Sequence, residues 1–309
     1  MKPEFIRFVR RGIRQGTWPL LQRYAAFKRI LNLPPIQISQ DSDFAVHILT
    51  CERDALMLHW AVRSFASHVS EPFQLVIHDD GSCSPNTLKR FSETFLGATV
   101  IPRRQACLEV AKHLRGFPNL LETNRNSFAS IRWIDFYLLG ASKFIIFLDP
   151  DVLFFASPTH LFEGSDSALW MRDCFYSLHI TQEEANDRFG GITLPQLNGG
   201  LGRIPRSCFD PMLASRVLDF MQQSYVGQRA AQLGLPTMDD MPYSAVYSAV
   251  YGKCHLLPES YQIGMEPGLQ GVIAKHYTTP RRFLFFEEGI PRVAHHLGVS
   301  LPPWLRERG

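Results

Sequence analysis

The first half of the chain alternates between short, continuously apolar runs and longer stretches with helical spacing. The short runs predict strands over residues 44–50, 73–80, 98–102 and 143–149, and the longer stretches predict helices over 53–68, 84–95, 104–114 and 126–140. An unbroken apolar run is typical of a strand buried on both faces of a parallel sheet. Alternation of such strands with helices predicts an α/β fold, with a mostly parallel, doubly wound central sheet and helices on both faces.

The second half of the chain is less regular. Its pattern predicts strands over residues 167–171, within 192–202 and over 254–258, a helix near 207–223 and a helical run over 242–251 that Gly252 terminates. Asn198-Gly199-Gly200 falls within the second of these strands. Glycines at such a place allow the backbone to approach a ligand closely or to bend tightly.

Residues 3–15 have the spacing of an amphipathic helix, with four arginines on one face and Phe5, Ile6, Val9 and Ile13 on the other. A basic helix with an apolar back is typical of a membrane-surface anchor. The same pattern also fits a helix that packs on the domain and leaves its arginines in water. This helical segment is predicted to occupy residues 1–33, and residues 34–43, which begin with two prolines, are predicted to be a linker.

The charge is distributed unevenly. Residues 1–33 contain eight Lys and Arg residues and one acid, so a net charge of +3 leaves the rest of the chain mildly acidic, which argues against a general nucleic-acid binder. Six scattered cysteines without a CxxC pair argue against a disulfide framework or zinc knuckle and for a reducing compartment. No apolar run approaches the roughly 20 residues of a membrane span, and no secretory signal is recognisable. We therefore expect a cytoplasmic protein, with peripheral contact to the inner face of a membrane through residues 3–15 as a hypothesis.

Two carboxylates follow the most apolar strand, FIIFL at 144–148. Asp149 and Asp151 stand one residue apart where this strand ends, at the edge where open α/β sheets bind their ligands. Two acids aimed into one crevice repel each other unless a cation lies between them. Oxygen ligands suit Mg²⁺ or Mn²⁺, which in turn suit a substrate diphosphate. An acidic turn without a metal is the alternative interpretation of the same residues.

A second strand also ends in acids, Asp79-Asp80, and Gly81 permits a sharp exit from it. Turns commonly contain these residues, so the motif alone is weak evidence. Its position gives it weight, because it follows a parallel strand and faces the same crevice as Asp149.

Taken together, these features resemble the GT-A-fold glycosyltransferases, especially the family 8 type that uses nucleotide-sugar donors, over roughly residues 43–290. The resemblance rests on the DxD-type Asp149-Pro150-Asp151, the LNGGL sequence at 197–201, a histidine near the end of the chain, His276, and Arg132, which stands 17 residues before the DxD motif. It implies a Rossmann-like nucleotide-sugar fold in a single domain, residues 44–305. Residues 44–155 would form the nucleotide-binding half and residues 156–305 the acceptor-side half.

The resemblance also implies roles for individual residues. Asp149, Asp151 and His276 would hold one Mn²⁺ or Mg²⁺ ion, which stabilises the charge that develops on the departing diphosphate. Further contacts to the nucleotide-sugar are expected from the strand ends, the helix arginine, the glycine-containing strand and the basic tail, namely Thr50, Glu52, Arg53, Asp79, Asp80, Arg132, Asn198, Gly199, Lys275, Arg281 and Arg282.

Two departures from the family pattern affect the chemistry. The tail motif HxxGxxKPW has Thr279 in place of its glycine and Arg282 in place of its lysine, and arginine and lysine hold phosphate differently. Retaining relatives carry Asp-Gln near the active site, whereas this chain has Asp239-Asp240. A carboxylate there could act as a general base in an inverting reaction or stabilise or capture an oxocarbenium-like centre in a retaining one. The pair also fits a helix N-cap, so the stereochemistry stays open.

The preferred hypothesis is a metal-dependent, hexosyltransferase-like enzyme that moves a sugar from a nucleotide-diphosphate sugar to an unknown acceptor. UDP is the nucleotide that the resemblance favours, and membrane attachment would favour an envelope or lipid-linked glycan as acceptor. A phosphoryl-transfer enzyme of the haloacid-dehalogenase type is one alternative, although its motif stands near the domain start and Leu153 replaces its usual Thr or Val. A non-catalytic nucleotide-sugar-binding adaptor is the other.

The membrane hypothesis predicts that the full chain sediments with vesicles of anionic lipid and that a chain lacking residues 1–33 does not, because the arginine-rich helix supplies the attraction. Vesicles of neutral lipid serve as the control. Equal sedimentation of both chains with anionic vesicles would exclude the helix as the anchor.

Overall fold

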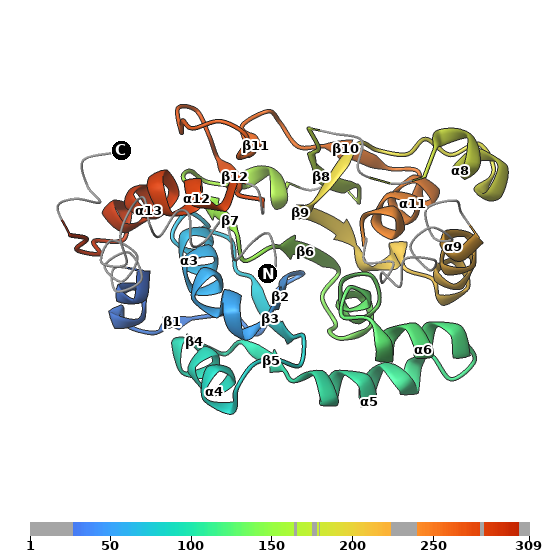
Figure 1. The fold of residues 1–309 in the computed structure, drawn as a ribbon, viewed down its shortest axis with the longest axis horizontal. Coiled ribbons are helices and arrows are strands. Elements are labelled where there is room, and N and C mark those ends of the chain that lie inside the picture. Colours follow the sequence, from blue (N-terminus) through green and yellow to red (C-terminus); the bar gives the residue numbers. More distant parts are fainter. Residues whose placement is uncertain are drawn as a thin grey trace, which may run out of the picture.

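The computed structural model describes residues 27–163, 166–174, 178, 180–223, 240–278 and 281–302. Its centre is a seven-stranded sheet in the order β10-β8-β9-β6-β2-β3-β5 (Figure 1). The strands are β2 (Phe44–Thr50), β3 (Gln74–Asp79), β5 (Thr99–Ile101), β6 (Phe144–Leu148), β8 (Ala168–Arg172), β9 (Leu197–Pro205) and β10 (Cys254–Leu256). β9 is antiparallel to both of its neighbours, and every other pair in this sheet is parallel. The predicted mostly parallel sheet is confirmed.

Helices cover both faces of this sheet, which explains the unbroken apolar run of β6. Ile145 and Phe147 belong to a core shared with α5, α6, α9 and α11, whereas Ile146 and Leu148 belong to a core shared with α3 and α4. Side chains alternate between the faces of a strand, so a strand covered on both sides is apolar at every position. The helices are α3 (Ala55–Ala66), α4 (Pro85–Thr94), α5 (Arg103–His113), α6 (Pro118–Asn126), α9 (Pro211–Gln223) and α11 (Met241–Tyr251).

Two smaller sheets flank the central one. β7 (Val152–Phe154), β12 (Ala274–His276) and β11 (Tyr261–Ile263) form a three-stranded sheet in the order β11-β12-β7, which continues directly from the end of β6. β1 (Ile36–Gln37) pairs with β4 (Phe95–Leu96). The stretch predicted to be a linker, residues 34–43, therefore contains a paired strand, and its Ile38 is buried in the core. This stretch packs on the domain.

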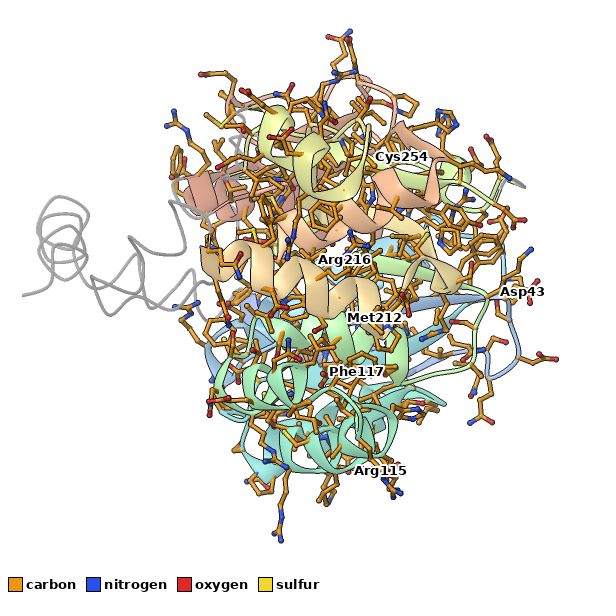
Figure 2. The ribbon with its side chains drawn as sticks, turned by 90° about the vertical axis from the view of Figure 1, so that its right-hand side faces the viewer. Asp43, Arg115, Phe117, Met212, Arg216 and Cys254 are labelled. Carbon is orange, nitrogen blue, oxygen red and sulfur yellow. The ribbon has the colours of Figure 1, made fainter. Side chains whose placement is uncertain are left out.

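The segment before β6 differs from its prediction. Asn126 was expected to begin a helix over 126–140, but it ends α6, which begins with Pro118 in its first turn. Ser127 then adopts an extended conformation, and a π-helix, Ile131–Asp135, and α7 (Phe136–Leu138) follow. α6 packs against α9, where Asn119 Nδ2 donates to Ser215 Oγ at 2.7 Å. Figure 2 shows this side of the molecule, with the labelled Met212 and Arg216 on α9.

Other short elements include α8 (Gln182–Phe189) and a C-terminal run of α12 (Arg282–Leu284), a π-helix (Phe285–Gly289) and α13 (Ile290–His296). Within the part of the chain that the structure describes, no helix is long and apolar enough to span a membrane. The amphipathic helix predicted over 3–15 lies outside the described residues.

Two histidines lie side by side inside the sheet. His47 of β2 and His78 of β3 are buried, and His47 Nδ1 lies 3.0 Å from His78 Nε2. Burial lowers the pKa of both rings, reinforced in His47 by the charge of its neighbour, and brings the pKa of His78 to about 3. Both rings therefore stay neutral in the folded protein, and an apolar wall formed by Phe136 packs beside them.

This pair predicts acid sensitivity. Between pH about 3 and the ordinary histidine pKa of 6.5, the unfolded chain binds more protons than the folded one. The contribution of His78 to the free energy of unfolding is therefore complete above pH 6.5 and decreases as the pH falls through this range. The expected slope reaches about 1.4 kcal/mol per pH unit for each histidine. Urea unfolding of His78→Phe should show a shallower slope than the wild type, and His113→Phe at an exposed position should not. An unchanged slope in His78→Phe would contradict this assignment.

Candidate active site

The DxD motif lies in the link between β6 and β7, and two hydrogen bonds hold it to neighbouring strands. Asp149 N donates to Gly200 O on β9 at 2.8 Å, and Tyr277 N donates to Asp151 O at 2.9 Å. β12 pairs antiparallel with β7 in a register that places His276 opposite Val152. This pairing brings a histidine from near the end of the chain beside two acids from its middle.

The three side chains offer ligand atoms to a common point. His276 Nε2 lies 3.1 Å from Asp151 Oδ1 and 3.6 Å from Asp149 Oδ2, and one ligand atom from each residue lies within 4.8 Å of the others. Two carboxylate oxygens and an imidazole nitrogen are a suitable set for a divalent cation such as Mn²⁺. The residues therefore fit the metal that the sequence predicts.

Asn198 orients the imidazole. Its side-chain Oδ1 lies 2.7 Å from His276 Nδ1 and also accepts a hydrogen bond from Gly200 N at 3.0 Å. Because an amide oxygen only accepts, Nδ1 carries the proton and Nε2 faces the acids. Histidines that bind metals commonly use the second ring nitrogen in this way, which fixes the ring and its tautomer.

The two glycines after Asn198 make room for charged side chains. A Cβ on Gly200 would lie 2.3 Å from His276 Nδ1, and a Cβ on Gly199 would lie 3.2 Å from Arg132 Nη2. The Asn-Gly-Gly sequence therefore has one function at each position: an acceptor for the imidazole, space for the guanidinium and space for the imidazole ring.

Arg132 reaches this cluster from the π-helix. Its guanidinium forms an ion pair with Asp149, donates to Gly199 O, and places Nε 2.6 Å from Asp240 Oδ2. Asp240 precedes α11 but makes no side-chain hydrogen bond to cap that helix, because its carboxylate turns to Arg132. Asp239, the other residue of the predicted catalytic pair, lies outside the described residues.

Opposing influences set the charges of the buried acids. Burial raises the pKa of Asp149 above its ordinary value, although Arg132 and His276 act against it. Burial is also the largest influence on Asp151, but the charges of His276 and Arg282 outweigh it and lower the pKa. In His276, burial is outweighed by Asp151, and the pKa is raised. The cluster is thus built around positive charge close to both acids.

A cleft of about 420 Å³ opens over the cluster. Of the residues predicted from sequence, it is lined by Thr50, Arg53, Asp80, Asp149, Asp151, His276 and Arg282. Sequence reasoning missed six others, Leu49, Cys51, Asp54, Phe128, Pro150 and Thr278. The parallel strands β2, β3 and β6 end at this cleft, which is the edge where ligands bind in this class of sheet.

Two predicted nucleotide contacts serve the local backbone. The Glu52 carboxylate accepts hydrogen bonds from Ser84 N and Thr87 Oγ1, both at 2.8 Å, at the start of α4. Asp79 Oδ1 accepts from Gly81 N at 2.9 Å and closes the turn after β3. Neither side chain lines the cleft.

The predicted contacts from the basic tail also differ from one another: Arg282 lines the cleft, whereas Lys275 and Arg281 do not. Lys275 points to the face of β12 opposite His276, because neighbours on a strand alternate. Its Nζ donates to Glu288 Oε1 at 2.6 Å and to Glu266 O at 2.7 Å, and 1% of the side chain is exposed. The predicted phosphate contact Lys275 thus has its charge paired with an acid behind the strand. Arg281 is not among the residues that line the cleft.

Asp54 and Phe128 are the most informative of the missed residues. Asp54 directly follows Arg53, which was predicted because it comes after the end of a strand. The same reasoning from strand ends could have predicted Asp54. Phe128 is 46% exposed at the cleft, and its sequence position inside the helix predicted over 126–140 gave no signal for this.

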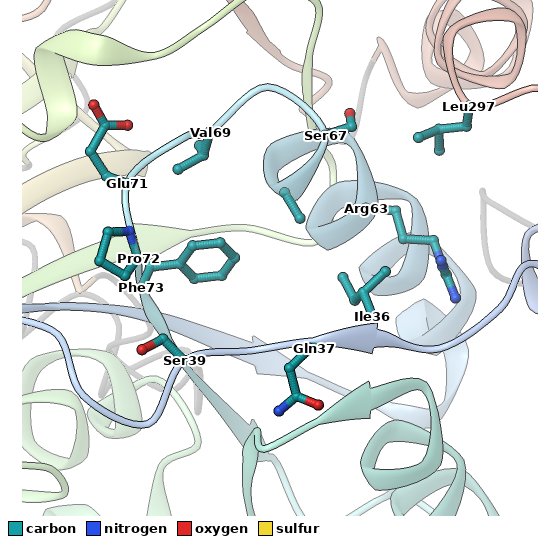
Figure 3. A pocket seen from close by; sticks show the side chains of 11 residues that line it. Ile36, Gln37, Ser39, Arg63, Ser67, Val69, Glu71, Pro72, Phe73 and Leu297 are labelled. Atoms are coloured by element: carbon teal, nitrogen blue, oxygen red, sulfur yellow. The ribbon is translucent and has the colours of Figure 1, made fainter.

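A second hollow of about 370 Å³ lies elsewhere, where β1 and the end of α3 meet Phe73 and Leu297 (Figure 3). Its charged lining residues are Arg63 and Glu71, and Arg63 Nη2 donates to Leu33 O and Pro34 O. Among the described residues, the one group of acids and histidines that could hold a metal ion, Asp149, Asp151 and His276, lies at the other cleft. The chemistry therefore points to the cleft at Asp149 and Asp151.

The architecture is the GT-A fold. The galactosyltransferase LgtC, solved with donor and acceptor sugar analogs, is 15% identical, with 86% of this chain and 100% of that one covered and a TM-score of 0.50. The bifunctional glycosyltransferase WbbM in its apo form is 9% identical, with 88% of this chain and 52% of that one covered and a TM-score of 0.51. Mouse xyloside xylosyltransferase 1 in its apo form is 11% identical, with 80% of this chain and 99% of that one covered and a TM-score of 0.46. At identities this low, the likeness to LgtC and WbbM establishes a common fold alone.

Comparison at the level of sequence gives no match. No protein-family model matches the chain, and a search of curated proteins finds no similar sequence. The predicted fold is thus confirmed through structure.

The crowding at Gly200 predicts a specific defect. Gly200→Ala should displace the His276 ring, abolish the rise in melting temperature expected from Mn²⁺ together with UDP, and destabilise the fold by about 1–3 kcal/mol. Gly116→Ala is the matched control, because its added Cβ would have no neighbour within 4 Å. Retention of the full Mn²⁺ effect in Gly200→Ala would show that the ring position does not matter for metal binding.

Proposed function

We propose that the protein is a metal-dependent glycosyltransferase that moves a sugar from a nucleotide-diphosphate sugar to an acceptor. The observation that carries this proposal is the convergence of Asp149, Asp151 and His276 at the carboxyl edge of a GT-A-type sheet, beneath an open cleft. A UDP-sugar is the favoured donor and Mn²⁺ or Mg²⁺ the favoured ion. The acceptor is a glycan, with an envelope or lipid-linked glycan favoured if residues 3–15 contact a membrane.

The chain's own residues divide the work at the donor. Asp149, Asp151 and His276 would hold the cation, which neutralises charge on the leaving diphosphate when bound. Arg282 adds a guanidinium at the same side of the cleft and can donate to phosphate oxygens. Thr50 and Asp80, at the ends of neighbouring strands, are placed for contacts to the nucleoside.

Arg132 and Asp240 are the proposed residues at the sugar. Asp240 holds its carboxylate 2.6 Å from Arg132 Nε, and a carboxylate in this position can stabilise positive charge at the anomeric carbon. A carboxylate can also attack that carbon or accept the acceptor's proton, so both stereochemical outcomes are compatible with this residue. Asn198 and Gly199, which contact the histidine and the arginine, support the donor site from below.

The proposal predicts a particular pattern in a thermal-shift panel. Nucleoside diphosphates should raise the melting temperature strongly with Mn²⁺ and weakly without it, with UDP producing the largest rise, because ligands that bind only the folded state stabilise it. Asp151→Ala should lose this response and sugar transfer while it keeps a cooperative melting transition. Asp43→Ala, at an exposed position, is the control.

Other outcomes separate the alternatives. Release of inorganic phosphate from simple phosphoesters, without any response to nucleotide sugars, would favour a phosphoryl-transfer enzyme. Binding of nucleotide sugars with neither hydrolysis nor transfer, across metals and acceptors, would favour an adaptor. Wild-type turnover in Asp151→Ala would refute the metal assignment.

A further inference from the structure

Arg282 connects Asp151 to a second carboxylate that lies outside the metal-binding cluster. Its Nε donates to Asp151 Oδ2 at 3.0 Å, and its Nη1 lies 3.4 Å from Asp54 Oδ1. The other oxygen of Asp151 faces His276 Nε2 at 3.1 Å. Both oxygens of this acid thus have a nitrogen partner from the chain itself.

Asp54 is in turn fixed by its neighbour in the sequence. Arg53 Nε and Nη2 each donate to one oxygen of Asp54, both at 3.1 Å. A chain of alternating charges, Arg53–Asp54–Arg282–Asp151, therefore leads from the rim of the cleft to the acids. Arg53 at the rim is 77% exposed, Asp54 and Arg282 are 12% and 28% exposed, and Asp151 is 6% exposed.

At the inner end of this row of charged side chains, a bound divalent ion and the Arg282 guanidinium would repel each other. A divalent ion held by Asp151 would lie close to the Arg282 guanidinium, and like charges at such a distance repel strongly in a partly buried site. Asp54 reduces that conflict, because its negative charge lies on the other side of the same guanidinium. A diphosphate that enters the cleft removes the conflict, because its oxygens can accept from Arg282 and ligate the ion together.

From this geometry we propose that Arg282 and Asp54 are a positioning pair that makes cation binding conditional on the diphosphate. Arg282 keeps the affinity of the three ligands for a lone divalent ion low, and Asp54 limits how far it is lowered. The inference rests on the proposed function and deepens it: the ion and the diphosphate enter as coupled ligands, each raising the affinity for the other by the same factor.

The test is the dissociation constant of Mn²⁺, measured by calorimetry and by the electron paramagnetic resonance signal of free Mn²⁺, with and without UDP. We expect Arg282→Gln to bind Mn²⁺ alone about tenfold more tightly than the wild type and to lose most of the coupling to UDP. Asp54→Asn should act in the opposite direction and weaken Mn²⁺ binding in the absence of UDP. Arg292→Gln, an exposed arginine of α13, is the matched control and should change neither constant.

The outcomes are distinguishable from failure of the proposed function. If wild-type protein binds Mn²⁺ neither alone nor with UDP, the metal site itself is refuted. If Mn²⁺ binds and Asp151→Asn abolishes it, but Arg282→Gln binds Mn²⁺ no more tightly and keeps the full coupling, only the positioning pair is refuted. Melting temperatures of each variant without ligands report whether a loss of binding reflects a loss of fold.

Discussion

The antiparallel pairing of β7 with β12 is the interaction on which the site depends. β7 begins immediately after the DxD motif, and β12 ends at His276, so their backbone hydrogen bonds determine how far the imidazole lies from the acids. A slip of one residue would turn the histidine to the other face of its strand, where Lys275 now pairs with Glu288. The small three-stranded sheet thus determines the positions of the acids and the histidine, and the carboxyl edge of the large sheet determines where in the fold they lie.

Placing one buried and two partly buried acids beside one another is costly unless each has a compensating partner. In this structure the compensation comes from separate elements: Arg132 from the π-helix lies between Asp149 and Asp240, and Arg282 from α12 serves Asp151. A π-helix shifts its side chains relative to those of an α-helix and is often found at functional sites. The guanidinium of Arg132 is therefore placed by a local irregularity of the backbone.

The sequence predicts those parts of the fold and site that depend on local patterns. Unbroken apolar runs predict the parallel strands, because helices cover both sides of β6, and acids at strand ends predict Asp80 and Asp149 in the cleft. Local patterns do not give the direction of individual side chains. Lys275 adjoins His276 in sequence, yet strand alternation sends it to Glu288, and Glu52 follows a strand, yet it accepts hydrogen bonds at the start of α4. Such outcomes depend on tertiary partners that no local pattern encodes.

The Asn-Gly-Gly sequence of β9 shows why the site tolerates so many charges in little space. Glycine within a strand weakens it, because no side chain packs there and the unfolded chain gains freedom. At Gly199 and Gly200 the absent side chains are replaced by the guanidinium of Arg132 and the ring of His276, which approach the backbone directly. The glycines thus make β9 less stable, but they let Arg132 and His276 come close to each other and to the backbone. The loss of side-chain packing is local, because β9 remains buried along its whole length between β6 and β8. A strand paired on both edges can carry its three glycines, Gly199, Gly200 and Gly202, where an edge strand could not.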